Sequence, residues 1–411
     1  MPSRSWSLDL PRDAAVHFTA GMHGDEHNGM LVHNWIRAPQ SNQGWGMTVS
    51  RRGLLLLSAG AAGVAAASAA GLVRRIEAGA KRAATIVSEP FTSRSASGMR
   101  LRDFGRTGMK VSEVGFGGWA IGGEAYGKVD REESLRALAR AEELGCNFVD
   151  TAMVYGDSEE LLGGFLADRR SRWIVATKYS GQKPDLERTL EAQLRRLRTE
   201  YVDFYQVHWT PGRDEEHLYE ALYRVKKAGK ARAVGVSLKN EQDIDRVLDH
   251  TLLDGFQVKL SLLDPYPFIA RVARLDTARP AIIIRSSLRE GFLTGKFRED
   301  VRFDDPKDQR SGLSREEIAR LVNSAERFRF LEAEAGSMVV AAARYPLSFP
   351  SVSTVILGTK STTQADSNFG KVPGAALSRE MLQRIYEEQR TLGLHSAKHL
   401  LADHVRSLIK R

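Results

Sequence analysis

Short hydrophobic runs alternate with amphipathic segments throughout the chain after residue 100. Eight of these runs have the length of a strand and few polar interruptions, as expected for parallel strands that are buried on both faces. They are EVGFGG (113–118), NFVDTA (147–152), WIVATKY (173–179), FYQVHW (204–209), ARAVGVS (231–237), GFQVKLS (255–261), AIIIRSSL (281–288) and STVILGT (353–359). The intervening segments 131–144, 185–197 and 215–227 place apolar residues three and four positions apart, which predicts helices.

Eight strands separated by helices predict an α/β protein with a (β/α)8 TIM barrel. An open doubly wound sheet is the alternative, but the glycines of GFGGWAIGG (115–123) lack the spacing of a dinucleotide-binding turn. The stretch 101–111 predicts a short N-terminal hairpin, with Thr107-Gly108 at its turn, that caps the bottom of the barrel. Segment 296–314 has no apolar period and is a candidate mobile loop over the site.

The chain before the barrel has a different character. Residues 1–46 show no periodicity and are interpreted as a disordered extension or a mis-assigned start. Residues 47–73 carry the pair Arg51-Arg52, an uncharged apolar run and small residues suited to cleavage. This segment resembles a twin-arginine export signal and predicts the twin-arginine translocase as a partner. An uncleaved membrane anchor and a chance apolar stretch in a cytoplasmic protein are the alternatives.

Three further segments complete the predicted organisation. Residues 74–98 form a basic linker, 99–392 the barrel, and 393–411 a C-terminal helical tail. The formal net charge of +9 raises the question of a nucleic-acid partner. Residues 1–100 hold 11 basic and 6 acidic side chains, so +5 lies there and only +4 in the remainder. With no supporting motif, a nucleic-acid partner is not expected.

Composition excludes two further classes of protein. Hydrophobic residues make up 42% of the chain, which is too many for a disordered scaffold. The single cysteine, Cys146, excludes an internal disulfide and a cysteine-based zinc site, and we interpret it as a small buried apolar residue. No metal site is expected, and the oligomeric state is left open.

Polar residues stand where the predicted strands end, which is where chemistry gathers in such barrels. Asp150 ends the second strand, Tyr155 follows in the next loop, Lys178 ends the third strand and His208 the fourth. A lysine ammonium lowers the pKa of a nearby phenol, and an aspartate keeps that lysine charged. A histidine can orient a carbonyl oxygen or relay a proton. These four residues therefore predict a proton-transfer group.

These motifs carry a family resemblance. In order, NFVDTAMVYG, ATKYS, DFYQVHW, GVS, FQV, REGFLTGK and ILGTKSTTQADSN resemble the motif series of the aldo-keto reductase superfamily across roughly residues 98–392. The resemblance places that family's catalytic tetrad on Asp150, Tyr155, Lys178 and His208. It implies NADPH-dependent reduction of an aldehyde or ketone, with Tyr155 as the general acid. Ion-channel β-subunits share the resemblance, so a cofactor-sensing regulatory barrel with little turnover is the alternative.

The resemblance also implies where NADP(H) binds. Ser237 and Gln257 would bind the nicotinamide carboxamide, whereas Leu238 stands where asparagine is common. The run 287–296 resembles the pyrophosphate loop, whose backbone N–H groups and lysine suit a dianionic bridge. A lysine and a serine after the eighth strand, beside free helix N–H groups, resemble the 2′-phosphate site of NADPH. The residues assigned to the phosphate and adenosine parts are Ser287, Leu288, Gly291, Leu293, Lys296, Gly358, Lys360, Ser361, Gln364 and Asn368.

Two aromatic residues are expected in the substrate pocket. Trp119 follows the first strand, and Trp209 ends the hydrophobic run of the fourth. Aromatic walls suit a small-molecule carbonyl compound with an apolar body. The sequence thus predicts one cavity that holds substrate and cofactor together.

Overall fold

The structure is a computed structural model that describes residues 93–123, 129–181, 185–374 and 376–395. The predicted N-terminal extension, the export signal and most of the linker lie outside the described residues, as does the tail beyond residue 395. Within the described ranges, no helix is both long enough and apolar enough to cross a membrane.

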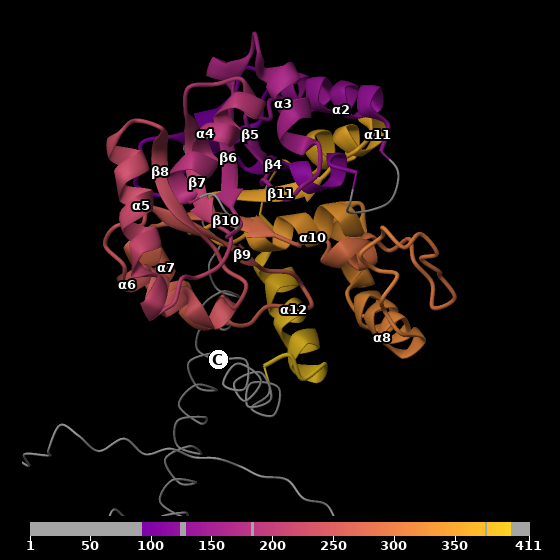
Figure 1. Ribbon diagram of the computed structural model, residues 1–411. Helices are drawn as coiled ribbons and strands as arrows, with labels where there is room; N and C mark the ends of the chain where they lie inside the picture. Colours follow the sequence, from indigo (N-terminus) through magenta and orange to yellow (C-terminus); the bar gives the residue numbers. More distant parts are fainter. Residues whose placement is uncertain (1–92, 124–128, 182–184, 375, 396–411) are drawn as a thin grey trace, which may run out of the picture. The chain divides into compact units, whose positions relative to one another are not determined.

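Eight parallel strands close into a barrel in the order β10-β11-β4-β5-β6-β7-β8-β9 (Figure 1). The strands are β4 (Val114–Gly117), β5 (Phe148–Asp150), β6 (Ile174–Tyr179), β7 (Val202–Val207), β8 (Ala231–Ser237), β9 (Gly255–Lys259), β10 (Ala281–Arg285) and β11 (Thr354–Gly358). Each strand overlaps one of the eight predicted hydrophobic runs, because side chains on both of its faces are buried. The predicted (β/α)8 barrel is confirmed.

Helices follow the strands and surround the barrel (Figure 1). They are α2 (Arg131–Glu143), α3 (Ser158–Leu166), α4 (Leu186–Leu197), α5 (Glu216–Lys227), α6 (Ile244–Asp249), α7 (Val272–Ala278), α8 (Arg315–Glu326), α9 (Glu332–Ala335), α10 (Met338–Leu347), α11 (Thr362–Ala365) and α12 (Arg379–Thr391). The carboxylates of Asp130 and Asp185 accept hydrogen bonds from backbone N–H groups in the first turns of α2 and α4. Such capping fixes where these helices begin.

The predicted hairpin is present at the N-terminal side of the barrel. Strands β2 (Arg100–Asp103) and β3 (Lys110–Ser112) pair antiparallel, and β1 (Ser93–Arg94) adds a third strand beside β2. The sequence placed Ser93 and Arg94 in the linker, but their backbones pair with residues 100 and 101. The ordered cap therefore begins earlier than the predicted boundary of the barrel at residue 99.

The turn between β2 and β3 fills the bottom of the barrel. The Phe104 ring is fully buried, and its centre lies 5.7 Å from that of Phe148 and 5.1 Å from that of Phe204. Gly105 has a φ of +57°, and a Cβ there would lie 2.2 Å from the backbone nitrogen of Ala281. Only glycine fits at this position, so the close approach of the hairpin to β10 depends on it.

The long segment between β10 and α8 begins with a turn of 3-10 helix, η6 (Arg289–Thr294), and then has no regular structure as far as α8. Its apolar side chains nevertheless gather into a small cluster with residues of η6 and α8. The members are Phe292, Phe297, Val301, Phe303, Leu313, Ile318, Leu321 and Val322. The predicted loop is therefore packed against the protein, while its mobility stays a prediction.

We expect Phe104→Ala to lower the free energy of unfolding by about 3–5 kcal/mol, because it leaves a cavity among buried aromatic rings. Urea denaturation followed by circular dichroism measures the change. Tyr223→Ala is the matched control, since the Tyr223 side chain is 48% exposed. Similar losses of unfolding free energy in the two variants would contradict the role of Phe104 in filling the bottom of the barrel.

Candidate active site

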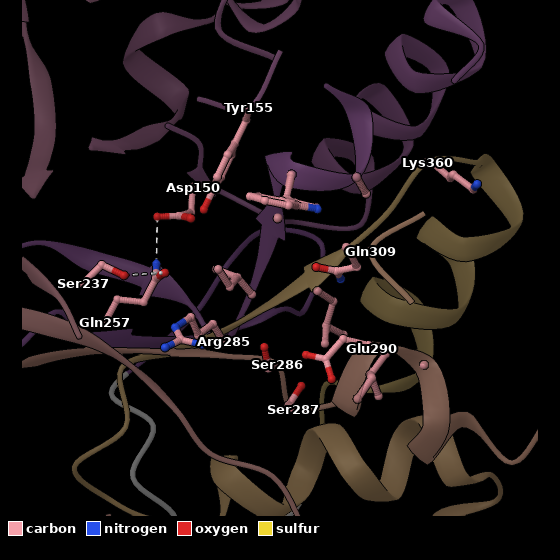
Figure 2. A pocket seen from close by; sticks show the side chains of 18 of the residues that line it. Asp150, Tyr155, Ser237, Gln257, Arg285, Ser286, Ser287, Glu290, Gln309 and Lys360 are labelled. Carbon is pink, nitrogen blue, oxygen red and sulfur yellow. Dashed lines mark hydrogen bonds between the residues drawn. The ribbon is translucent and has the colours of Figure 1, made fainter. Parts of the chain in front are cut away.

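A cavity of about 560 Å³ lies at the C-terminal ends of the barrel strands. Figure 2 shows Asp150 and Tyr155 at one part of it and Lys360 at a distance from them. The predicted site residues that line it are Trp119, Asp150, Tyr155, His208, Ser237, Gln257, Ser287, Leu288, Gly291, Lys296, Gly358, Lys360 and Gln364. Residues from seven separate regions of the sequence thus meet at one cavity, because parallel strands bring their carboxyl ends together.

Lys178 lies beneath this cavity in a buried ion pair. Its Nζ lies 2.6 Å from Oδ2 of Asp150 and donates a second hydrogen bond, of 2.8 Å, to the carbonyl of Thr151. Burial is the largest single influence and acts to lower the pKa of Lys178, but the charges and hydrogen bonds of Asp150 and Tyr155 together outweigh it, and the pKa rises above its usual value. Lys178 is therefore charged at neutral pH.

Tyr155 is held between the pair and an aromatic wall. The Lys178 Nζ lies 4.9 Å from the centre of the Tyr155 ring, and the Trp119 ring meets that ring edge-on at 4.6 Å. At Gly122, a Cβ would lie 1.9 Å from the carbonyl oxygen of Tyr155, so glycine lets the tyrosine loop come close. These contacts fix the direction of the phenol.

The sequence predicted a lowered pKa for Tyr155, and the structure corrects this direction. Burial raises the pKa of Tyr155, and the positive charge of Lys178 opposes the rise without reversing it. The enclosed cavity keeps water away from the phenolate. The free-energy cost of this desolvation exceeds the stabilisation that the Lys178 ammonium provides. The phenol therefore keeps its proton, as an acid must before it transfers one.

His208 completes the group as a neutral imidazole. Its Nδ1 lies 3.0 Å from Oγ of Ser180, and its ring centre lies 5.9 Å from that of Tyr155. Burial, together with nearby lysine and arginine charges, lowers the pKa of His208 to about 3. A neutral imidazole has one N–H donor and one acceptor nitrogen, so His208 can orient a polar ligand atom.

The two predicted carboxamide ligands connect directly to the buried pair. The Ser237 hydroxyl donates to Oε1 of Gln257 at 3.2 Å, and Nε2 of Gln257 donates to Oδ1 of Asp150 at 2.9 Å (Figure 2). An amide ligand needs one donor and one acceptor at fixed positions, and these side chains offer both. Their positions are tied to that of Asp150.

Positive charge gathers at another part of the cavity. Lys296, Lys360 and Arg310 line it, while Nε of Arg310 donates to Asp308 at 2.8 Å. Partial burial and the charges of Arg310 and Lys360 lower the pKa of Lys296. The buried hydroxyl of Ser287 also lines the cavity and has no hydrogen-bond partner among the described residues. Three cations and an unpaired hydroxyl suit the phosphates of a nicotinamide dinucleotide.

Some backbone N–H groups of the run 287–296, which the sequence assigned to a pyrophosphate, donate hydrogen bonds within the protein instead. The N–H groups of Gly291 and Leu293 both donate to the carbonyl of Leu288, at 3.0 and 3.1 Å. Leu293 is fully buried in the core and does not line the cavity. These amides close the left-handed turn around Glu290, which corrects the expectation that they face a pyrophosphate.

Two of the helix N–H groups that were expected to be free after β11 donate hydrogen bonds within the protein. The Ser361 hydroxyl accepts from the N–H of Gln364 at 3.2 Å, and the Glu133 carboxylate of α2 accepts from the N–H of Thr362 at 2.7 Å. Asn368 is buried and donates to a threonine hydroxyl of the same turn. Ser361 and Asn368 therefore hold the turn together and do not line the cavity, which corrects their predicted role.

Trp209 is also placed differently from the prediction. Its Nε1 donates to Oε2 of Glu215 at 3.0 Å, and its ring centre lies 6.0 Å from that of Tyr179. It does not line the cavity. The hydrogen bond to Glu215 and the contact with Tyr179 hold the indole outside this cavity.

Sequence reasoning missed several polar residues of the cavity wall. These are Lys239, Arg285, Ser286, Glu290, Gln309 and Arg310. Arg285 ends β10, so the strand-end rule that located the tetrad also indicates this residue. Gln309 and Arg310 arrive from the long loop, and no local pattern marks them. These residues add polar groups to the cavity wall beyond those that the sequence indicated.

The fold and the cavity together define a class of protein. A (β/α)8 barrel carries a buried acid–base group and a cluster of cations in one cavity. This combination is typical of an enzyme that positions an anionic cofactor beside a proton donor.

Comparison with known proteins gives the family. The sequence pattern of the Aldo/keto reductase family matches residues 113–389, and the chain belongs to this family. It is 28% identical to the aldo-keto reductase YhdN of Bacillus subtilis (strain 168) over 306 residues, which cover 69% of this chain and 91% of that protein. It is 28% identical to L-galactose dehydrogenase of Arabidopsis thaliana, over 67% of this chain and 88% of that protein.

Among solved structures, the glycerol dehydrogenase of Gluconobacter oxydans is similar, with a TM-score of 0.60 and 26% identity. The match covers 74% of this chain and 97% of that one. The family consists of oxidoreductases that use nicotinamide cofactors and act on small carbonyl compounds. The protein is therefore an oxidoreductase of this kind.

We expect His208→Asn to make stability less sensitive to acid. The imidazole of the unfolded chain gains a proton below its ordinary pKa of 6.5, whereas that of the folded protein stays neutral down to about 3. The wild type should therefore lose about 1.4 kcal/mol of unfolding free energy per pH unit, relative to the variant, as the pH falls below about 6.5. Urea denaturation at about pH 7 and about pH 5 measures this difference. Identical pH dependence in both proteins would contradict the neutral state of His208.

Proposed function

We propose that the protein reduces an aldehyde or ketone to an alcohol with NADPH. A bound nicotinamide cofactor would supply the hydride to the carbonyl carbon, while Tyr155 would donate its proton to the carbonyl oxygen and be reprotonated from solvent. The observation that carries the proposal is the position of Tyr155 above the buried pair of Lys178 and Asp150, in the same cavity as the cationic cluster.

Each member of the group has a distinct part in the proton transfer. Tyr155 holds its proton because burial raises its pKa. When the proton leaves, the charge of Lys178 stabilises the phenolate, and Asp150 keeps Lys178 charged. Neutral His208 faces the same cavity and can orient the carbonyl oxygen by a hydrogen bond. The nicotinamide cofactor, when bound, supplies the hydride.

We also propose that Lys360 contributes to a preference for NADPH over NADH. It lines the cavity next to the turn that begins α11. Its positive charge acts to lower the pKa of both Lys296 and Asp308. The 2′-phosphate of NADPH is a dianion that a nearby lysine attracts. Glu133 works against this preference, because its carboxylate bonds to Thr362, two residues from Lys360.

Lys360→Gln is expected to weaken NADPH binding about tenfold and to change NADH binding little, because only NADPH carries the 2′-phosphate. Titration of protein fluorescence with each cofactor gives the two dissociation constants. Lys371→Gln, at the end of the helical segment Asp366–Lys371 that follows α11, provides a control of equal charge change outside the cavity lining. An equal loss for both cofactors would contradict the assignment of Lys360.

Tyr155→Phe tests the mechanism. It should reduce carbonyl turnover by about 100-fold or more, because the general acid is lost, while cofactor binding is retained. Steady-state oxidation of NADPH with a panel of aldehydes and ketones measures the first property, and fluorescence titration the second. Full activity in the variant would contradict the role of Tyr155. If the wild type itself binds cofactor tightly but turns over near background, the cofactor-sensing regulatory barrel is the better description.

We further propose that the chain is exported through the twin-arginine translocase. The support is the segment 47–73, with its paired arginines, apolar run and small residues. A translocase that carries folded proteins would allow export of a barrel already loaded with its cofactor. Cell fractionation with N-terminal sequencing should find a shortened, extracytoplasmic protein. An intact leader in the cytoplasm would contradict export, and an intact leader in the membrane fraction would indicate an anchor.

A further inference from the structure

The lysine and arginine side chains that line the cavity lie in two separate places. Lys296, Lys360 and Arg310 form one group, because the charges of the last two act to lower the pKa of Lys296. Lys239 lies elsewhere along the cavity wall, and its charge acts to lower the pKa of His208 instead. The first group suits the cofactor phosphates, which leaves the charge of Lys239 without an assigned ligand.

The order of the barrel strands produces this separation. Lys239 comes two residues after the end of β8, and β8 pairs with β7, the strand that ends just before His208. The register of that pair sets His208 beside Ser237, so Lys239 stands two residues further toward the barrel mouth. Lys360 follows β11, and β9 and β10 stand between β11 and β8. Figure 2 shows Ser237 and Lys360 at opposite sides of the cavity.

The protein does not neutralise the charge of Lys239. Among the described residues, two carboxylates line this cavity, and both pair with other cations. Asp150 pairs with Lys178, and Glu290 pairs with its neighbour Arg289. Lys239 is exposed and makes no ion pair with the part of the chain that the structure describes. An ammonium group at the mouth of a cavity attracts an anion that enters it.

We propose that Lys239 binds an anionic group of the substrate, so that the protein prefers aldehydes or ketones that carry a carboxylate or a phosphate ester. The carbonyl group lies beside Tyr155 and His208, and a short carbon chain connects it to the anionic group at Lys239. The attraction between the two charges is stronger in a partly enclosed cavity than in bulk water. The inference rests on the proposed function, because it requires a carbonyl substrate in this cavity.

The properties of a lysine side chain determine what this contact selects. Two residues of extended chain span about 7 Å, so the ammonium meets a group that lies several bonds from the carbonyl carbon. The flexible four-carbon stem of lysine reaches anionic groups at a range of distances. The contact therefore selects for charge more than for one chain length. The anionic group takes no part in the reaction, so its binding lowers KM and leaves kcat nearly unchanged.

Arg285 is a second cation at this part of the cavity, but it is bonded within the protein. Its charge also acts on His208, while its Nη2 donates to the carbonyl oxygen of Leu238 at 2.6 Å. Lys239 has the longer reach toward the mouth, because it lies beyond the end of β8 in the following loop. It is therefore the residue to substitute in a test of anion binding.

Three variants and two matched pairs of aldehydes test the proposal. Lys239→Gln removes the charge, Lys239→Arg keeps it, and Lys230→Gln is the control. Lys230 directly precedes β8, at the opposite end of the barrel, and its side chain is 38% exposed. Each purified full-length protein is assayed at saturating NADPH. Succinic semialdehyde is compared with butanal, and glyceraldehyde phosphate with glyceraldehyde, so that the members of a pair differ chiefly in the anionic group.

We expect the wild type to prefer the anionic member of at least one pair by about tenfold in kcat/KM, and Lys239→Gln to lose most of that preference through a higher KM. Lys239→Arg and Lys230→Gln should keep it. The pair that responds identifies the anionic group as a carboxylate or a phosphate ester. The neutral aldehydes should respond little to Lys239→Gln, because burial is the largest cause that keeps His208 neutral.

Three results would overturn the proposal. The first is a wild type without a preference for either anionic aldehyde, and the second is a preference that Lys239→Gln retains. The third is a loss of NADPH affinity in Lys239→Gln, measured by fluorescence titration, because it would assign the lysine to the cofactor. Circular dichroism of each variant shows whether the fold is intact.

A binding measurement separates this proposal from the proposed function. If the wild type reduces no aldehyde or ketone, isothermal titration with succinate in the presence of NADP⁺ still measures the anion site. Binding that is about tenfold weaker in Lys239→Gln than in Lys230→Gln would support the role of Lys239 and count against the reductase. Equal binding in these variants, or none in the wild type, would overturn the role of Lys239. Reduction of neutral aldehydes without any effect of Lys239 would support the reductase alone.

Discussion

The arrangement of the active cavity depends on the buried ion pair between Lys178 and Asp150. An ammonium group without a partner at this depth would cost several kcal/mol, so the barrel can hold Lys178 only with an acceptor on the neighbouring strand. Asp150 supplies that acceptor, and its second oxygen accepts from Gln257 on the far side of the barrel. Removing either charge would leave the other buried and unpaired. The pair, with its hydrogen bond to Gln257, thus links β5, β6 and β9. It also determines the position of the Tyr155 ring, which lies beside Lys178.

Burial favours the neutral forms of two other ionisable groups of the cavity, Tyr155 and His208. It raises the pKa of Tyr155 and lowers that of His208, so both are neutral near pH 7. The proton-transfer group therefore holds one available proton on the phenol and the two opposite charges of Lys178 and Asp150. Further positive charge of the cavity lies on Lys296, Lys360 and Arg310, whose side chains suit phosphates. This separation lets one cavity hold a charged cofactor and still exclude water from the reacting groups.

Several features of the site could be predicted because they follow from strand position alone. Asp150, Lys178 and His208 stand at or just after the ends of consecutive strands, and the closed barrel brings such ends together whatever the loops do. Other features depend on the path of a loop. Trp209 is held outside the cavity by its hydrogen bond to Glu215 in the following loop, and Arg310 reaches the cavity from a segment with no regular structure. Neither outcome has a periodic signal in the sequence.

The sequence by itself determined the eight-stranded barrel, because strands buried on both faces require near-continuous hydrophobic runs that are visible residue by residue. It also determined which residue types stand at the strand ends. Only the tertiary structure decided how those side chains share their hydrogen bonds and charges. The backbone donors near Leu288 and Thr362 are occupied from within the protein, and Arg285 bonds to the carbonyl of a residue 47 positions away. Hydrogen bonds and desolvation depend on distances between segments that are far apart in sequence, and local pattern carries no information about those distances.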